Sequence, residues 1–173
     1  MVSQQTQYEI NNDYWPKAVT INQTADLINH YAQIPWQWMA TLDLEPGTTQ
    51  EKAERLLKWW RKSIYGYHKL QIAHEGIFNA QGNTGRHLHL LMLGRSANGR
   101  SLLHIPDPEV RELEHTWQKM AHRSASIEWV YDLLGAVRYV YGNNVTNNPA
   151  WQQLCAYNKR LLKKARTRAR FFN

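Results

Sequence analysis

Two histidines, His87 and His89, stand one leucine apart inside an apolar run, and they are the first residues in the chain whose chemistry is suggested by spacing. Residues two apart on a β-strand point to the same face, so both imidazoles can reach one cation. An alternating His-Leu-His also fits plain polar-out, apolar-in patterning. Two imidazoles are an incomplete metal site, so the metal interpretation requires a third ligand from a neighbouring segment.

The neighbouring segment is expected to be the other arm of a β-hairpin. Two strand-like runs, 70–78 and 86–94, flank a turn-rich stretch of seven residues. Folding about Gly82 places Glu75 opposite His89 and on the same face as both histidines, whereas a slip by one residue would offer His74 instead. Opposite residues have Cβ atoms about 4.5–5.5 Å apart. Glu75, His87 and His89 therefore form a predicted site for Mn²⁺, Mg²⁺ or Zn²⁺.

The elements around this hairpin predict an α+β fold with helices packed on a mostly antiparallel sheet. The order is strand, helix, strand, strand, helix, strand, helix, helix. The expected elements are a strand over 36–44, a helix over about 49–65 begun by a Thr48–Glu51 capping box, the hairpin, a helix begun by Asp107-Pro108, a strand near 126–131, a helix over about 133–141 capped by Asp132, and a last helix from Asn148-Pro149.

Composition limits the organisation of the chain. It has 173 residues, of which 43% are hydrophobic, and we expect one compact unit: an N-terminal extension (1–35), a core (36–145) and a basic C-terminal helix or tail (146–173). No apolar stretch reaches the roughly 18–20 residues that cross a bilayer. The single cysteine, Cys155, cannot close an internal disulfide. We expect a cytoplasmic protein with no membrane partner.

The charge is distributed unevenly along the sequence. The net charge is +7, yet every Asp and Glu lies at or before Asp132, and residues 133–173 carry eight Lys or Arg. Concentrated positive charge attracts phosphate backbones or anionic lipid. A solvated basic tail is the plain alternative, so charge alone does not decide the partner.

Three segments together resemble the HUH endonucleases, and among them the rolling-circle replication initiators (Rep proteins). Residues 39–44 (MATLDL) resemble the first Rep motif, residues 87–92 (HLHLLM) resemble the HUH motif, and residues 135–141 (GAVRYVY) resemble the tyrosine-bearing helix, in the family's order. The resemblance implies a ferredoxin- or RRM-like nuclease fold, with Glu75, His87 and His89 holding Mg²⁺ or Mn²⁺ beside the scissile phosphate.

The nucleophile of such an enzyme would be Tyr139 or Tyr141, which lie roughly 200° apart around a helix, so only one can face the metal. Tyr139 shares its face with small residues, whereas Tyr141 shares its face with apolar ones. The resemblance also favours Tyr139, the first tyrosine of the family's Tyr-x-x-Lys. The lysine of that motif falls on Gly142 here, and Arg138, Lys159 or another basic residue would have to replace its charge.

The activity that the resemblance implies is nicking and joining of single-stranded DNA through a covalent 5′-phosphotyrosine, at a replication origin of a plasmid or virus. The expected DNA contacts are Thr41, Arg86, Arg138, Lys159, Arg160, Lys163 and Lys164. The chain has no phosphate-binding motif of a motor, so a separate helicase would unwind the DNA. The alternatives are a non-catalytic nucleic-acid-binding module, a water-using metal hydrolase, and an HUH transposase or relaxase.

Overall fold

The computed structural model describes residues 21–79, 85–96, 107–143 and 151–154, together with 158, 160, 162, 163 and 165. Its elements are α1 (Ile21–Tyr31), β1 (Trp38–Asp43), α2 (Gln50–His68), β2 (Leu70–Asn79), β3 (His87–Ser96), α3 (Asp107–Ala121), β4 (Ala125–Trp129), α4 (Leu133–Val137), the π-helical turn η1 (Arg138–Asn143) and β5 (Trp151–Gln153). The predicted α+β class is confirmed, and every strand pair is antiparallel.

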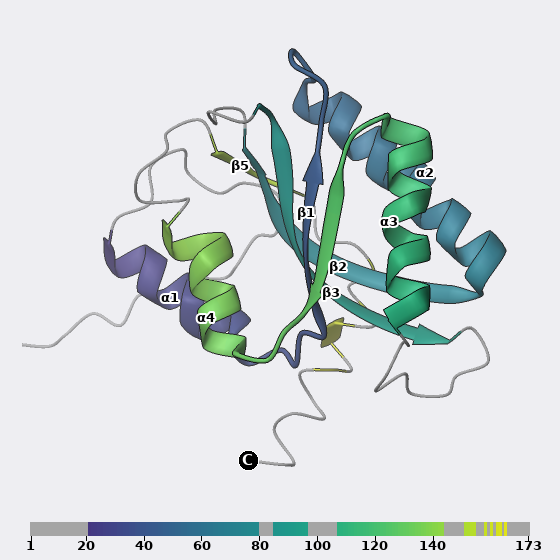
Figure 1. The fold of residues 1–173 in the computed structure, drawn as a ribbon. Coiled ribbons are helices and arrows are strands. Elements are labelled where there is room, and N and C mark those ends of the chain that lie inside the picture. The colour runs from purple at the N-terminus through teal and green to yellow at the C-terminus, as the bar shows by residue number, and fades with distance from the viewer. Residues whose placement is uncertain are drawn as a thin grey trace, which may run out of the picture.

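The strands lie in the order β4-β1-β3-β2-β5. The first four strands, with α2 between β1 and β2 and α3 between β3 and β4, have the split βαβ arrangement called ferredoxin-like. Helices α2 and α3 lie together on one side of the sheet, and α1 and α4 lie on the other (Figure 1). Strand β3 is therefore central and is covered on both faces.

Each face of the sheet has its own core. The alternation in β1 behaves as predicted, because Trp38, Ala40 and Leu42 are fully buried and pack in the core under α2 and α3. A second core lies under α1 and η1 and includes Tyr31, Leu91 and Tyr141. β3 contributes to both cores through successive residues, so its odd-numbered positions face α1 and η1.

The predicted boundaries of two elements need correction. The cap of α2 is Thr49, whose hydroxyl accepts from the Lys52 amide at 3.2 Å, rather than Thr48, which is buried. The last predicted helix does not begin at 148–149, because Trp151–Gln153 forms β5 along the edge of β2. This strand satisfies backbone groups that the edge of β2 would otherwise leave unpaired.

Among the described residues, no helix combines the length and apolar character needed to span a membrane. Residues 1–20 of the predicted N-terminal extension lie outside the described part of the chain, and its remainder contributes α1 to the second core.

Candidate active site

His87 and His89 lie side by side on β3, on the face toward α1 and η1, as the two-residue spacing predicts. Their ring centroids are 4.5 Å apart and the rings are nearly perpendicular. The intervening Leu88 is fully buried on the opposite face. The strand therefore uses alternate residues for packing and for a polar site.

The register of the hairpin differs by two residues from the predicted one. His89 is opposite Ile77, and Glu75 is opposite Leu91, two pairs farther along the hairpin. A shift of two keeps Glu75 on the predicted face but moves it away from the histidines and into the second core, where it is buried near Tyr141. His87 lies between two partners, Asn79 opposite it on β2 and Asp43 opposite it on β1.

Polar neighbours orient both imidazoles. The Gly85 carbonyl lies 3.2 Å from His87 Nδ1 and can only accept, so in the neutral ring this nitrogen carries the proton and Nε2 has the lone pair. The Asn79 side-chain amide lies 3.4 Å from that Nε2. On the other ring, Thr41 Oγ1 lies 3.2 Å from His89 Nδ1. Thr41, which we expected to contact DNA, therefore holds a histidine.

The environment keeps His89 neutral at physiological pH. Burial, with electrostatic repulsion from the adjacent His87 ring as a smaller cause, lowers its pKa to about 4. A neutral imidazole is the form that binds a metal ion. Burial of His89 thus favours its neutral form, which is the form that can bind a metal ion.

The structure brings two of the three predicted metal ligands, His87 and His89, together. The described residues contain no group of three or more His, Cys, Asp or Glu that could hold a metal, so Glu75 does not complete the pair. Two imidazoles whose Nδ1 atoms contact a carbonyl and a hydroxyl fit the usual support of metal-bound histidine. Asn79 offers a third metal ligand, because rotating its side-chain amide would turn the oxygen Oδ1 toward the His87 ring. Sequence reasoning missed Asn79, which only the true register brings opposite His87.

Tyr139 and Tyr141 lie in η1 and have opposite environments. Tyr139 is 43% exposed, and its ring centroid is 5.2 Å from that of His89 in an edge-to-face arrangement. Tyr141 is fully buried and stacks on Tyr31 with centroids 4.2 Å apart. Burial raises the pKa of Tyr141 well above its ordinary value, and nearby Tyr31 and Glu75 add to this. Of the two tyrosines, Tyr139 is the one beside the histidine pair.

A capped turn sets the position of these tyrosines. Asp132 is the N-cap of α4, as predicted, and its carboxylate accepts from the Gly135 amide at 2.9 Å. A Cβ at position 135 would approach that carboxylate to 2.3 Å, so a larger residue there would displace the capping side chain. The predicted helix then continues as the π-helical η1. Single π turns are rare and are frequent at functional sites.

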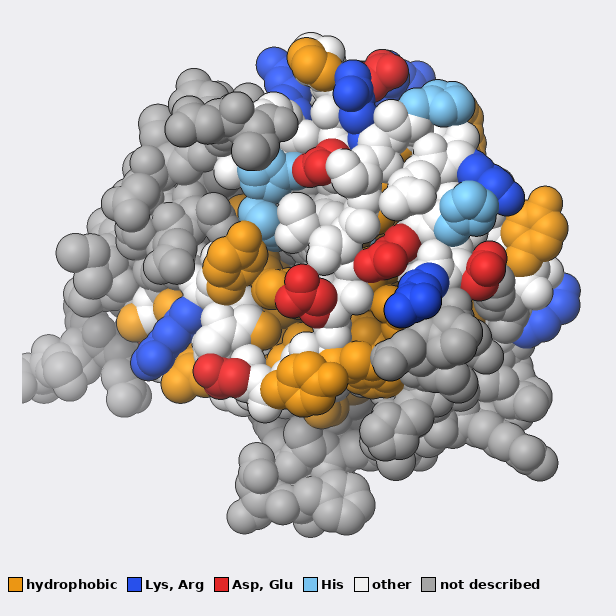
Figure 2. Space-filling view, viewed as in Figure 1, with side chains coloured by type: hydrophobic (Ala, Val, Ile, Leu, Met, Phe, Trp, Pro, Cys, Tyr) orange, Lys and Arg blue, Asp and Glu red, His pale blue; other side chains and the backbone are white. Residues whose placement is uncertain are grey.

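The predicted DNA-binding cations have different surroundings. Arg86 donates to the backbone carbonyl of Thr48 and so anchors the loop after β1. Arg138, Arg160 and Lys163 are exposed. Lys159 and Lys164 lie outside the described residues. On the face seen in Figure 2, histidine, acidic and hydrophobic side chains share the middle, and most cations lie toward the edges.

Comparisons of this chain with family models, curated proteins and solved structures find no match.

Proposed function

We propose that this protein is a metal-dependent enzyme that nicks and rejoins single-stranded DNA, with Tyr139 as the nucleophile. The observation that supports this most directly is the packing of the exposed Tyr139 ring against His89 at 5.2 Å. At this point the hydroxyl-bearing side chain of Tyr139 lies beside the two imidazoles and is open to solvent. The order of the sequence motifs is the second support, because it resembles that of the HUH endonucleases.

The reaction is a transesterification that conserves bonds. The phenolic oxygen of Tyr139 attacks the phosphorus of a DNA phosphodiester and loses its proton. The bond from phosphorus to the 3′ oxygen breaks, and that oxygen takes up a proton as a free 3′ hydroxyl. The 5′ phosphate remains esterified to Tyr139, and the reverse reaction rejoins a strand. Edge-to-face contact with His89 restricts the tyrosine ring, which reduces the entropy lost on attack.

The polar residues of β1, β2 and β3 would bind the ion. Mn²⁺ or Mg²⁺ held by His87, His89 and the Asn79 amide oxygen would polarise a non-bridging phosphate oxygen. Thr41 would fix the His89 ring, and the Gly85 carbonyl would fix the His87 ring. Arg138 is exposed next to Tyr139 in η1 and would supply the positive charge that Gly142 lacks.

We infer a role in starting rolling-circle replication of a plasmid or virus in a host cytoplasm. Such an initiator needs a single-stranded origin, for example in a hairpin, and a separate helicase. Single-stranded DNA leaves bases and backbone accessible to a surface site of this kind.

The test is capture of the covalent intermediate. The protein would be incubated with Mn²⁺ and a pool of single-stranded oligonucleotides of random sequence that carry a dye at the 3′ end, then resolved on a denaturing gel. The label stays on the fragment that is joined to the enzyme. We expect a slow, dye-bearing protein band with wild type, and no such band with Tyr139→Phe or with EDTA.

Tyr131→Phe is the matched control, because Tyr131 is 92% exposed and belongs to the turn before α4. It should form the adduct as wild type does. Cleavage without an adduct would instead indicate a water-using hydrolase. An adduct that persists in Tyr139→Phe would exclude this nucleophile, and binding without cleavage or adduct would indicate a non-catalytic module.

A further inference from the structure

The outer face of α2 is a surface that the candidate active site does not use. Arg55, Lys58, Trp59, Lys62 and Tyr65 are all exposed, and each is three or four residues from another member, so they are neighbours on the helix surface. We call these five residues the α2 face. Trp59 is 56% exposed and Tyr65 is 48% exposed, although large aromatic side chains are usually buried.

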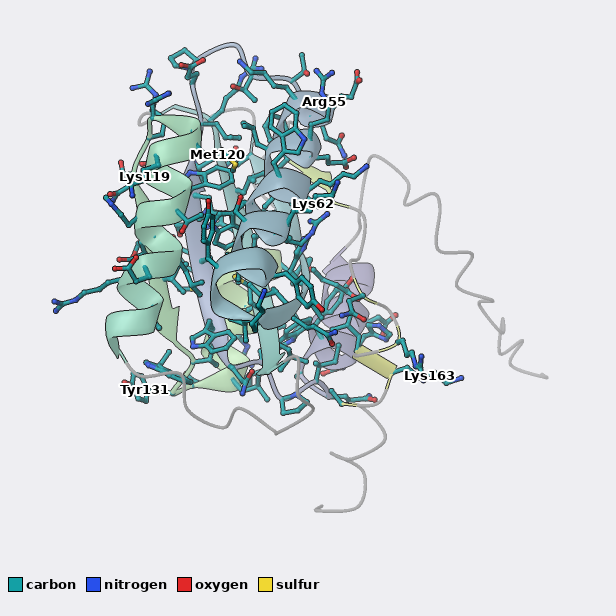
Figure 3. The ribbon with its side chains drawn as sticks, turned by 90° about the vertical axis from the view of Figure 1, so that its right-hand side faces the viewer. Arg55, Lys62, Lys119, Met120, Tyr131 and Lys163 are labelled. Carbon is teal, nitrogen blue, oxygen red and sulfur yellow. The ribbon has the colours of Figure 1, made fainter. Side chains whose placement is uncertain are left out.

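Helix α2 turns its other side to the sheet. Ala53, Leu57, Trp60 and Ile64 are buried in the core under α2 and α3. The aromatic residues of the α2 face are therefore not needed for packing the domain. Figure 3 shows Arg55 and Lys62 on the side of α2 that faces the viewer, away from the sheet.

The positive charge of the α2 face is only partly balanced within the described part of the chain. Arg55 pairs with Glu51 at 4.0 Å. No ion pair joins Lys58 or Lys62 to any described acid, and no acid occurs between residues 55 and 74 of the sequence. Lys58 and Lys62 are four residues apart, so their like charges repel each other slightly. An anionic partner would remove this repulsion.

We propose that the α2 face binds a segment of single-stranded nucleic acid, separate from the segment at the histidine pair. Trp59 and Tyr65 would stack on bases, and Lys58, Lys62 and Arg55 would contact phosphates along the strand. Alternating cations and aromatic rings are the means by which proteins bind single strands without reading sequence. Side chains that are one helical turn apart are separated by about 5.4 Å along the axis, which lets them follow an extended backbone.

An anionic membrane is the competing partner, since it also attracts cations and aromatic rings. A helix that lies in a bilayer surface buries an apolar face in the acyl region. The apolar face of α2 is occupied by the protein's own core, and the α2 face contains no aliphatic residue. Stacking on bases therefore fits these side chains better than insertion into lipid.

This inference rests on the proposed function and extends it. Helix α2 and the histidine pair lie on opposite faces of the sheet. After cleavage by Tyr139, the strand could remain bound through α2 while its 3′ hydroxyl end is free. The binding itself requires neither metal nor nucleophile, so it can be tested in the absence of both.

The experiment is fluorescence anisotropy with a dye-labelled oligothymidine and the full chain in EDTA, over a range of salt concentrations. Trp59→Ala should weaken binding at least about fivefold through lost stacking. Lys58→Gln/Lys62→Gln should weaken binding and lower the slope of log affinity against log salt by about 1.4. The control is Arg111→Gln/Lys119→Gln, which removes two charges from exposed positions of α3 and should leave both quantities near wild type.

Thermal unfolding would show that the variants remain folded. Equal losses in the α2 and α3 double variants would mean that only net charge matters and would overturn the proposal. So would an α2 double variant that keeps its oligonucleotide affinity but no longer sediments with phosphatidylserine vesicles. Weaker oligonucleotide binding by the α2-face variants in EDTA supports the inference even if no covalent adduct forms. The two proposals therefore fail independently.

Discussion

The two faces of the sheet differ in what they do with polar residues. The face under α2 and α3 is a packed core, in which Trp60 Nε1 donates to the Leu113 carbonyl at 3.0 Å. The face under α1 and η1 is packed at one end around Tyr141 and leaves His87 and Tyr139 accessible at the other. The helices that cover each face, rather than the strands, therefore determine where polar side chains remain accessible.

His74 and His89 show the same difference between the two faces. His74 on β2 is 1% exposed, and its Nε2 is 2.5 Å from Arg61 Nη1. Burial, with the Arg61 charge as a smaller cause, lowers its pKa to about 3. His89 is nearly as buried and has a similarly lowered pKa, yet it contacts the exposed Tyr139. A lowered pKa alone therefore does not distinguish a structural histidine from one at a candidate site.

The largest expected effect is on the stability of the α2–α3 face. Trp117 is fully buried, meets Trp60 edge to face at 5.8 Å and donates to the Asp43 carbonyl. Trp117→Ala should lower the free energy of unfolding by about 3–5 kcal/mol, because it leaves a large cavity. Urea unfolding measures this. Trp59→Ala, on an exposed tryptophan of the same layer, should change stability by less than about 0.5 kcal/mol; equal losses would contradict the assignment of the core.

The next effect separates the two histidines by activity. His89→Ala should reduce adduct formation by more than the roughly 10–100-fold that loss of a supporting residue costs, and Thr41→Val should fall within that range. His74→Gln should leave the adduct rate of the folded protein within a few-fold of wild type. The comparison fails if His74→Gln abolishes adduct formation in folded protein while His89→Ala does not.

Acid should destabilise the fold through these histidines. An unfolded histidine takes up a proton near pH 6.5, whereas His74 stays neutral in the fold down to about pH 3. Stability is thus complete above pH 6.5 and falls as pH decreases toward 3. At pH 5 the loss from His74 is about 2 kcal/mol. Urea unfolding at pH 7.5 and 5.0 should show a smaller loss in His74→Gln; an identical loss would exclude this origin.

The smallest effect concerns the turn that presents Tyr139. Asp132→Ala removes the N-cap of α4 and should cost about 1 kcal/mol of unfolding free energy. Asp132→Asn should recover most of it, because an amide oxygen also caps a helix. Both are measured by thermal unfolding beside the adduct assay. A loss in Asp132→Asn as large as in Asp132→Ala would show that charge, rather than the cap, matters.

Much of the fold could be predicted from periodicity. The strand alternation, the amphipathic faces of α2 and α3 and the Asp132 cap are local properties, and the structure agrees with them. The hairpin register was wrong by two residues, because a seven-residue turn does not fix its own symmetry. The strand β5 was also missed, since what makes it a strand is the edge of β2 rather than its own sequence.

The sequence by itself determined that His87 and His89 share a face and that Tyr139 and Tyr141 point to opposite sides, because both follow from the repeat of a strand or a helix. Only the tertiary structure decided which residues meet them. Pairing across β2 and β3 put Asn79 opposite His87, and it put Glu75 opposite Leu91 instead of His89. The packing of η1 put Tyr139 against His89 while Tyr141 entered the core. Those contacts join residues far apart in the chain, so they depend on the register and layering of the whole sheet.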